Sequence, residues 1–180
     1  MLIATLGPAG SNHELVANRY LNRHAPQGSI LLYTAFEDAF KALLEHKVDR
    51  VLQCTAHPEH GHYVGRYMHR VFPVDAFIAG SKPLAILARA DVKTPKTLAL
   101  QPATRFYTDL SGYAEIIEEP SIVNVSEGLL NGEYDAGICA QEVQAQYPQQ
   151  LRTVKELGPA LDTWVMFGRT PLSNTNSRVY

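Results

Sequence analysis

Three histidines, His57, His60 and His62, stand close together in one polar stretch of the chain. Imidazoles exchange protons near neutral pH and are common metal ligands, so this stretch suits either proton transfer or metal binding. A metal site is not favoured, because neither cysteine lies in a C-x-x-C pattern and no H-E-x-x-H motif is present. We therefore expect no metal and no cofactor. His57 is interpreted as a polar or proton-handling group, with a purely structural loop histidine as the alternative, and His60 and His62 as solvent-facing.

A second candidate for chemistry lies near the N-terminus, where the apolar run Leu2-Ile3-Ala4-Thr5 leads into Gly7-Pro8-Ala9-Gly10-Ser11. Apolar residues then recur at helical spacing, which predicts a strand, a turn and a helix that begins near Ser11. The first backbone N–H groups of a helix are unpaired and attract a carboxylate or phosphate. An ordinary capped helix is the alternative. The phosphate-loop and dinucleotide patterns are absent, because no Gly-Lys-Ser/Thr and no suitably placed third glycine is present.

A comparable junction is predicted from Gln101 to Arg105, where Pro102 follows a short apolar run. The Arg105 guanidinium has the geometry to bind a carboxylate through two nitrogens, and a solvated surface arginine is the alternative. Cys54 and Cys139 have no neighbouring acid–base group, so they are interpreted as small buried side chains.

The composition excludes several classes of protein. The 180 residues include 16 Lys and Arg against 18 Asp and Glu, so neither a nucleic-acid nor an acidic-membrane partner is expected. No apolar run approaches about 20 residues, and the N-terminus does not resemble a signal peptide. With only two cysteines, a disulfide framework is not expected. These features favour a cytoplasmic protein.

Strand-like and helix-like segments alternate along the chain and must position these groups. Helices are expected from Ser11 through Leu21, over 36–44, from Pro102 through Leu110, after Ser121 and after Ala140. Strands are expected over 2–6, 29–34, 51–54, 74–79, 84–88, 97–100, 114–118, 135–140 and 164–167. Such alternation predicts α/β architecture with a mainly parallel sheet in each lobe. Ligands then bind beyond the carboxyl ends of strands, at Gly10-Ser11, after Cys54, at Gln101–Arg105 and at Ala140-Gln141.

Two motifs make the chain resemble the prephenate dehydratase domain over nearly its whole length, from Leu2 to Gly168. They are Gly7-Pro8-Ala9-Gly10-Ser11 with Glu14, and Gly132-Glu133-Tyr134-Asp135-Ala136-Gly137-Ile138 followed by Gln141-Glu142. The resemblance implies a two-lobed fold like that of the type 2 periplasmic binding proteins, with a central cleft. It implies a first lobe over 1–80 completed by 157–170, a second lobe over 83–155, and hinges near Gly80-Ser81 and Leu157-Gly158. We expect a flexible tail over 171–180 and no regulatory ACT domain, and the resemblance also allows a homodimer.

Departures from the dehydratase pattern suggest a different reaction. Dehydratases carry Pro-Ile-Glu-Asn-Ser-x-x-Gly in the first lobe, whereas in this chain the window is Cys54-Thr55-Ala56-His57-Pro58-Glu59-His60-Gly61. Their closing Thr-Arg-Phe is replaced by Val165-Met166-Phe167, preceded by Trp164. Both changes are similar to the non-aromatising prephenate decarboxylases, such as that of the bacilysin pathway. In dehydratases the threonine protonates the leaving hydroxyl, and Val165 is unable to do so.

The resulting prediction is a cytoplasmic lyase that decarboxylates prephenate, or a close cyclohexadienyl dicarboxylate, without aromatisation. One alternative is a dehydratase whose acid has moved to Thr104 or His57, and another is a non-catalytic protein that binds a small carboxylate. The predicted catalytic residues are His57, Thr104 and Trp164, although Trp164 is equally compatible with core packing. The predicted substrate-binding residues are Gly10, Ser11, Asn12, Thr55, Gln101, Ala103, Arg105, Ser121, Gln141 and Thr163.

Overall fold

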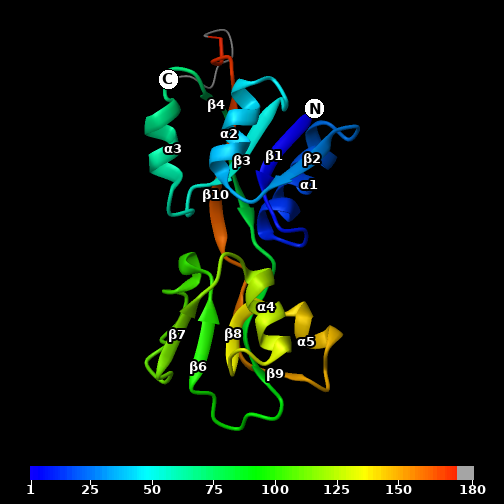
Figure 1. The fold of residues 1–180 in the computed structure, drawn as a ribbon. Helices are drawn as coiled ribbons and strands as arrows, with labels where there is room; N and C mark the ends of the chain where they lie inside the picture. The colour runs from blue at the N-terminus through cyan, green and yellow to red at the C-terminus, as the bar shows by residue number, and fades with distance from the viewer. Residues whose placement is uncertain (174–180) are drawn as a thin grey trace. The chain divides into compact units, whose positions relative to one another are not determined.

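The structure is a computed structural model in which residues 1–173 are described. The chain forms two units (Figure 1). The first consists of Met1–Gly80 together with the chain from Leu161 onward, and the second of Ser81–Ala160. We predicted that the chain passes from the second lobe back to the first near Leu157-Gly158, whereas the second unit ends at Ala160. Of the tail predicted over 171–180, residues 174–180 lie outside the described part of the chain.

The sheet of the first unit has the strand order β2-β1-β3-β10-β4. Its strands are β1 (Leu2–Leu6), β2 (Ser29–Tyr33), β3 (Arg50–Cys54), β4 (Phe72–Gly80) and β10 (Leu161–Gly168). Strands β1, β2 and β3 are parallel, but β10 runs antiparallel to both β3 and β4. Strand β4 therefore runs in the same direction as β1, β2 and β3, and the sheet is mainly parallel, as predicted, with β10 as its antiparallel strand. The chain enters β10 directly from the second unit, without the crossover helix that a parallel strand requires.

Helices cover both faces of this sheet. They are α1 (Asn12–His24), α2 (Phe36–Leu44) and α3 (His60–Tyr67). Helix α1 packs with Trp164 on one face, and α2 and α3 pack with Phe167 on the other. Helix α3 corrects the prediction that His60 and His62 lie in a loop. It forms because Tyr63 and its neighbour one helical turn on bury their rings against α2, a tertiary contact that the glycine-rich sequence does not reveal.

The sheet of the second unit has the strand order β7-β6-β8-β5-β9. Its strands are β5 (Leu84–Arg89), β6 (Thr97–Leu100), β7 (Glu115–Glu118), β8 (Ala136–Ala140) and β9 (Leu151–Gly158). Strands β6, β7 and β8 are parallel, and β5 is antiparallel to β8 and β9. Strand β9 was not predicted. Its central residues, 153–156, are exposed, so the strand lacks an apolar alternation and forms through backbone pairing with β5.

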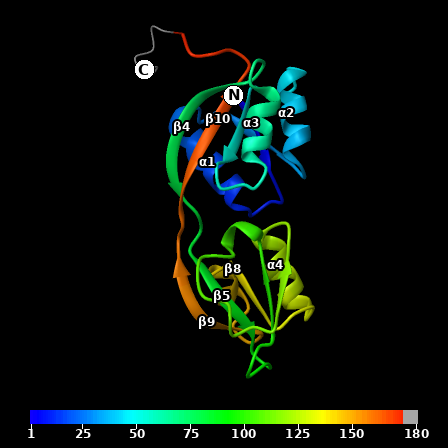
Figure 2. The same ribbon diagram turned by 90° about the vertical axis from the view of Figure 1, so that its left-hand side faces the viewer.

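Two helices and one 3-10 turn complete the second unit: α4 (Ile122–Asn131), α5 (Glu142–Gln146) and η1 (Pro102–Thr104). Figure 2 shows α4 beside β8 and β5, where Val125 and Leu129 are buried against the sheet. The helix predicted from Pro102 through Leu110 is wrong, because regular structure stops at Thr104. Phe106 and Leu110 would share one face of such a helix, but Leu110 packs against the core whereas the Phe106 side chain is 91% exposed.

Among the described residues, no helix combines the length and the apolar character needed to cross a lipid bilayer. Both cysteines are buried, as predicted, and neither forms a disulfide.

Candidate functional site

In the first unit the predicted site residues gather at the edge where β1, β2 and β3 end. The three strands are parallel, so the turn at Gly10-Ser11 and the loop at Thr55 follow strands that finish at the same edge. Strand β10 reaches this edge from the other direction, with Trp164 opposite Cys54. The backbone N–H and the hydroxyl of Thr55 both donate to the Thr163 carbonyl, at 2.9 and 3.1 Å. Thr55 and Thr163 are thus brought together.

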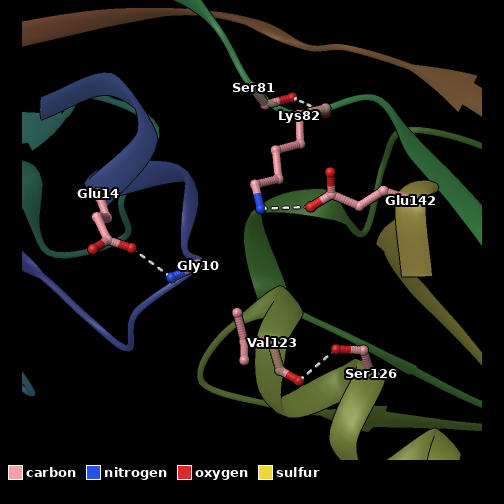
Figure 3. A network of polar contacts seen from close by, with 7 residues as sticks. All are labelled: Gly10, Glu14, Ser81, Lys82, Val123, Ser126 and Glu142. Atoms are coloured by element: carbon pink, nitrogen blue, oxygen red, sulfur yellow. Dashed lines mark hydrogen bonds and ion pairs between the residues drawn. The ribbon is translucent and has the colours of Figure 1, made fainter. Parts of the chain in front are cut away.

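The start of α1 is capped by the chain itself. The Ser11 hydroxyl accepts from the Glu14 N–H at 3.2 Å and donates to the Leu6 carbonyl at 3.1 Å. The Glu14 carboxylate in turn accepts from the Gly10 N–H at 2.5 Å (Figure 3). This arrangement is a variant of the capping box, in which Glu14 accepts from the N–H of the residue before the cap, and it already places a carboxylate at the positive end of the helix. A ligand carboxylate at Gly10 therefore competes with Glu14. Asn12 lies half-buried in the first turn.

A cluster of rings stands beside this capped turn. The His13 ring contacts those of Phe36, His57 and Trp164 edge-on, with centroid separations of 5.5, 6.4 and 5.0 Å. Phe36 and His57 are themselves 5.0 Å apart. We call His13, Phe36, His57 and Trp164 the imidazole–aromatic cluster. His13 was not among the predicted site residues, although its place two residues after the capping Ser11 was the available signal.

Burial keeps both imidazoles of the cluster neutral at pH 7. It lowers the pKa of His13 to about 3, with repulsion from His57 as the second cause. Burial is also the main reason that the pKa of His57 is lowered. The Glu59 N–H donates to His57 Nδ1 at 3.2 Å, so the proton of the neutral His57 ring lies on Nε2. His57 therefore presents a neutral N–H donor rather than a cation.

Two nitrogen atoms of the cluster, His13 Nε2 and Trp164 Nε1, are buried without a hydrogen-bond partner among the described residues. Buried polar groups are normally paired, so each unpaired nitrogen weakens the fold. The Trp164 side chain is only 1% exposed and packs in the core beneath α1. It is thus a core residue, one of the two predicted alternatives, and its ring also contacts that of His13.

A second polar contact in this unit was not predicted. His60 Nδ1 lies 3.0 Å from the Oε1 atom of Gln53, a fully buried residue on β3. The other amide atom, Nε2, has no partner in the described part of the chain. His60 is half-buried, and burial lowers its pKa, whereas His62 is exposed as expected. A buried glutamine has no local sequence signature, so only the fold reveals this contact.

In the second unit, the predicted site residues line the edge where the parallel strands β6, β7 and β8 end. The Gln101 side chain accepts from the Ala103 N–H at 2.9 Å. The buried Thr104 hydroxyl donates to the Gln101 carbonyl at 2.8 Å, so its proton already stabilises the turn. Arg105 pairs with Glu118 at 3.0 Å. A ligand carboxylate at Arg105 therefore competes with Glu118.

The remaining predicted residues stand on the same edge. Ser121 caps α4, as predicted: its hydroxyl accepts from the Asn124 N–H at 3.1 Å and donates to the Asn124 side chain at 2.7 Å. The Gln141 amide donates to the Glu156 carboxylate at 2.9 Å. Each of these polar groups has a partner from its own unit, so ligand binding there must exchange partners.

Within residues 1–173, no three His, Cys, Asp or Glu side chains are arranged to hold a metal ion. Burial raises the pKa of Cys54 to about 11 and that of Cys139 to about 12. Both thiols are therefore protonated and poorly nucleophilic at neutral pH.

No protein-family model and no curated protein matches the sequence. Several solved structures share the fold. A prephenate dehydratase from Arthrobacter aurescens, in complex with L-Phe, is 17% identical, with a TM-score of 0.71 over 97% of this chain and 63% of that protein. The periplasmic VFT2 domain of BvgS from Bordetella pertussis is 15% identical, with a TM-score of 0.57 over 93% of this chain and 80% of that domain. GqqA, described as a novel type of quorum-quenching acylase, is 12% identical, with a TM-score of 0.56 over 96% of this chain and 65% of that protein.

These likenesses confirm the predicted α/β fold of two lobes, related to those of prephenate dehydratase and of a periplasmic binding domain. The chain spans 63% of the length of the dehydratase that it matches. Proteins of different activity share this architecture, so the fold alone does not assign the reaction.

Proposed function

We propose that this protein is a lyase that removes carbon dioxide from prephenate, or from a close cyclohexadienyl dicarboxylate, without forming an aromatic ring. The observation that carries the proposal lies on β10. The positions that resemble the closing Thr-Arg of dehydratases hold Val165, which is half-buried, and Met166, which is 1% exposed in the core. Neither side chain protonates a hydroxyl or binds a carboxylate, so assisted loss of the ring hydroxyl has no donor at these positions.

Decarboxylation alone makes different demands on the site. The bond between the ring carbon and the carboxyl carbon breaks, and its electron pair moves into the diene. A proton then adds to a ring carbon, while the hydroxyl stays in place. A carboxylate departs more readily from a dry, uncharged surface, because water stabilises its charge before the bond breaks. The neutral, half-buried imidazole of His57 provides such a surface, and the rings of His13 and Phe36 pack against it.

Polar groups at the strand ends of each unit are candidates for binding the second carboxylate and the oxygens of the substrate. Thr55, Thr163 and the His57 Nε2 proton are the candidates on the first unit. Gln101 and Arg105 are the candidates on the second unit, where Arg105 would exchange Glu118 for a substrate carboxylate.

Incubation of the purified protein with prephenate tests the proposal by ultraviolet absorbance and product analysis. We expect a non-aromatic keto acid and no phenylpyruvate above the uncatalysed background. A Val165→Thr, Met166→Arg double variant should begin to form phenylpyruvate, and Val165→Ala, Met166→Leu is its matched apolar control. Substantial phenylpyruvate from the unmodified protein would exclude the proposed decarboxylase and favour a dehydratase with a relocated acid.

A non-catalytic carboxylate-binding protein is the second candidate, because the imidazoles of the cluster are neutral and provide no cationic acid at pH 7. The same experiment separates the two, since a binding protein leaves prephenate unchanged while calorimetry still detects its association.

A further inference from the structure

Lys82 is a largely covered lysine that was not among the predicted site residues. Its ammonium lies 2.7 Å from the Glu142 carboxylate (Figure 3). The Lys82 side chain is 21% exposed, whereas that of Glu142 is 55% exposed. Lysine side chains are rarely covered to this degree unless they are paired. The lysine is therefore the more covered partner of the ion pair, and the glutamate is the more exposed one.

The backbone around Lys82 is held on both sides. The Ser81 hydroxyl donates to the Lys82 carbonyl at 2.8 Å and accepts from the Ala160 N–H at 3.0 Å. The carbonyl of Pro83 accepts from the Gln141 N–H at 2.9 Å. These bonds fix the start of the lysine side chain relative to the start of α5. Preorganisation of this kind lowers the entropy lost when a ligand binds.

The ion pair lines a cavity of about 330 Å³. The lining residues are Lys82, Pro83, Gln141, Glu142, Gln144 and Ala145. Small-molecule pockets commonly measure about 300–1,000 Å³, so this cavity is large enough for a compact ligand. Its polar groups are one cation, one carboxylate and two amides, which suit a ligand that carries a carboxylate.

The strand registers place Lys82 on the predicted ligand edge of the second unit. Leu84 at the start of β5 pairs with Ala140 at the end of β8, and β6 ends on the other side of β8. Lys82 before β5 and Arg105 after β6 therefore belong to the same edge, on strands two places, or about 10 Å, apart. Each of the two cations is paired with a glutamate of its own unit.

We propose that Lys82 binds one carboxylate of the ligand, releasing Glu142 as it does so. This inference rests on the proposed function, which makes the ligand a dicarboxylate, and it adds a second carboxylate-binding residue beside Arg105. In the absence of ligand, the Glu142 carboxylate pairs with the Lys82 ammonium, and the ligand carboxylate takes its place on binding. No covalent step is involved.

The two partners of the ion pair provide the test. Calorimetric titration with prephenate should show about tenfold weaker binding for Lys82→Met, which keeps the aliphatic stem but loses the charge-assisted hydrogen bond. Glu142→Gln should bind about two- to fivefold more tightly, because the ligand no longer competes with the Glu142 carboxylate for the lysine. Lys155→Met, which removes a lysine that donates to Thr108 at 2.6 Å, is the control and should bind as the parent does. Weaker binding by Lys82→Met together with tighter binding by Glu142→Gln supports the inference. Melting curves should show that both variants are folded.

Unchanged affinity for Lys82→Met, or a loss of affinity in both partner variants, overturns the inference and indicates a structural ion pair. Succinate, a dicarboxylate without a ring, separates this outcome from failure of the proposed function. If the parent binds succinate but not prephenate, and Lys82→Met weakens succinate binding, the Lys82 inference stands and the proposed substrate is wrong. If the parent binds neither compound, both proposals fail.

Discussion

Replacing His13 with glutamine should remove a large part of the acid sensitivity of the first unit. His13 is held neutral in the folded protein, with a pKa of about 3, whereas the unfolded chain has the ordinary value of 6.5. Between these values the unfolded state binds a proton that the folded state excludes. The stabilisation from the neutral ring is therefore complete above pH 6.5 and is lost progressively as the pH falls toward 3.

The expected size follows from these two values. Between pH 7 and pH 5 the unfolded histidine becomes almost fully protonated while the folded one does not, which lowers the free energy of unfolding by about 2 kcal/mol. His57 and His60 also contribute to the loss of stability at low pH, because burial lowers the pKa of each. His13→Gln should abolish only the His13 contribution to the loss of unfolding free energy between pH 7 and pH 5.

Urea unfolding at pH 7 and pH 5 measures this effect. The single tryptophan, Trp164, lies in the first unit, 5.0 Å from the His13 ring, so its fluorescence reports unfolding of the unit in question. The matched control is His62→Gln, which changes an exposed imidazole on α3 and should retain the full pH dependence. An equal loss of stability between pH 7 and pH 5 in the parent and in His13→Gln, to within about 0.5 kcal/mol, would refute the assignment of a buried neutral His13.

Three further predictions concern contacts seen in the structure. Ser11→Ala removes the cap of α1 and should lower the free energy of unfolding by about 1 kcal/mol in urea titrations, whereas no change would mean that Glu14 alone caps the helix. Arg105→Ala should weaken prephenate binding about ten- to a hundredfold in calorimetry, while Glu118→Gln should strengthen it; unchanged affinity in both would place the carboxylate elsewhere. Gly128→Ala should destabilise the second unit by about 1–3 kcal/mol in thermal melts, because the added Cβ overlaps the Tyr134 side chain; an unchanged melting temperature would contradict this packing.

Features that depend on neighbouring residues in the chain could be predicted from the sequence. Ser11 and Ser121 were identified as helix caps because a hydroxyl three residues before a free N–H is a local arrangement. The apolar face of α2 was predicted from its helical spacing, and its buried residues include Phe36, Ala39, Phe40 and Leu43 of that face. Most strands were found because they are short apolar runs between turns.

The structure changed the interpretation wherever distant segments meet. Helix α3 forms because Tyr63 stacks on Phe40, and β9 forms because β5 offers it a backbone partner. The helix expected through Leu110 does not form, and Phe106 and Leu110, which would share one of its faces, are not buried together. Propensity describes a segment in isolation, whereas these outcomes depend on what the segment packs against.

The sequence by itself thus determined most of the elements and their order, the helix caps and the strand ends at which polar residues collect. Only the tertiary structure decided which polar groups are paired and which are buried. It brought His13 against Trp164 and His57, and it gave Arg105 and Lys82 their glutamate partners. The physical reason is that burial and charge pairing depend on distances between residues far apart in the chain, which no local spacing encodes.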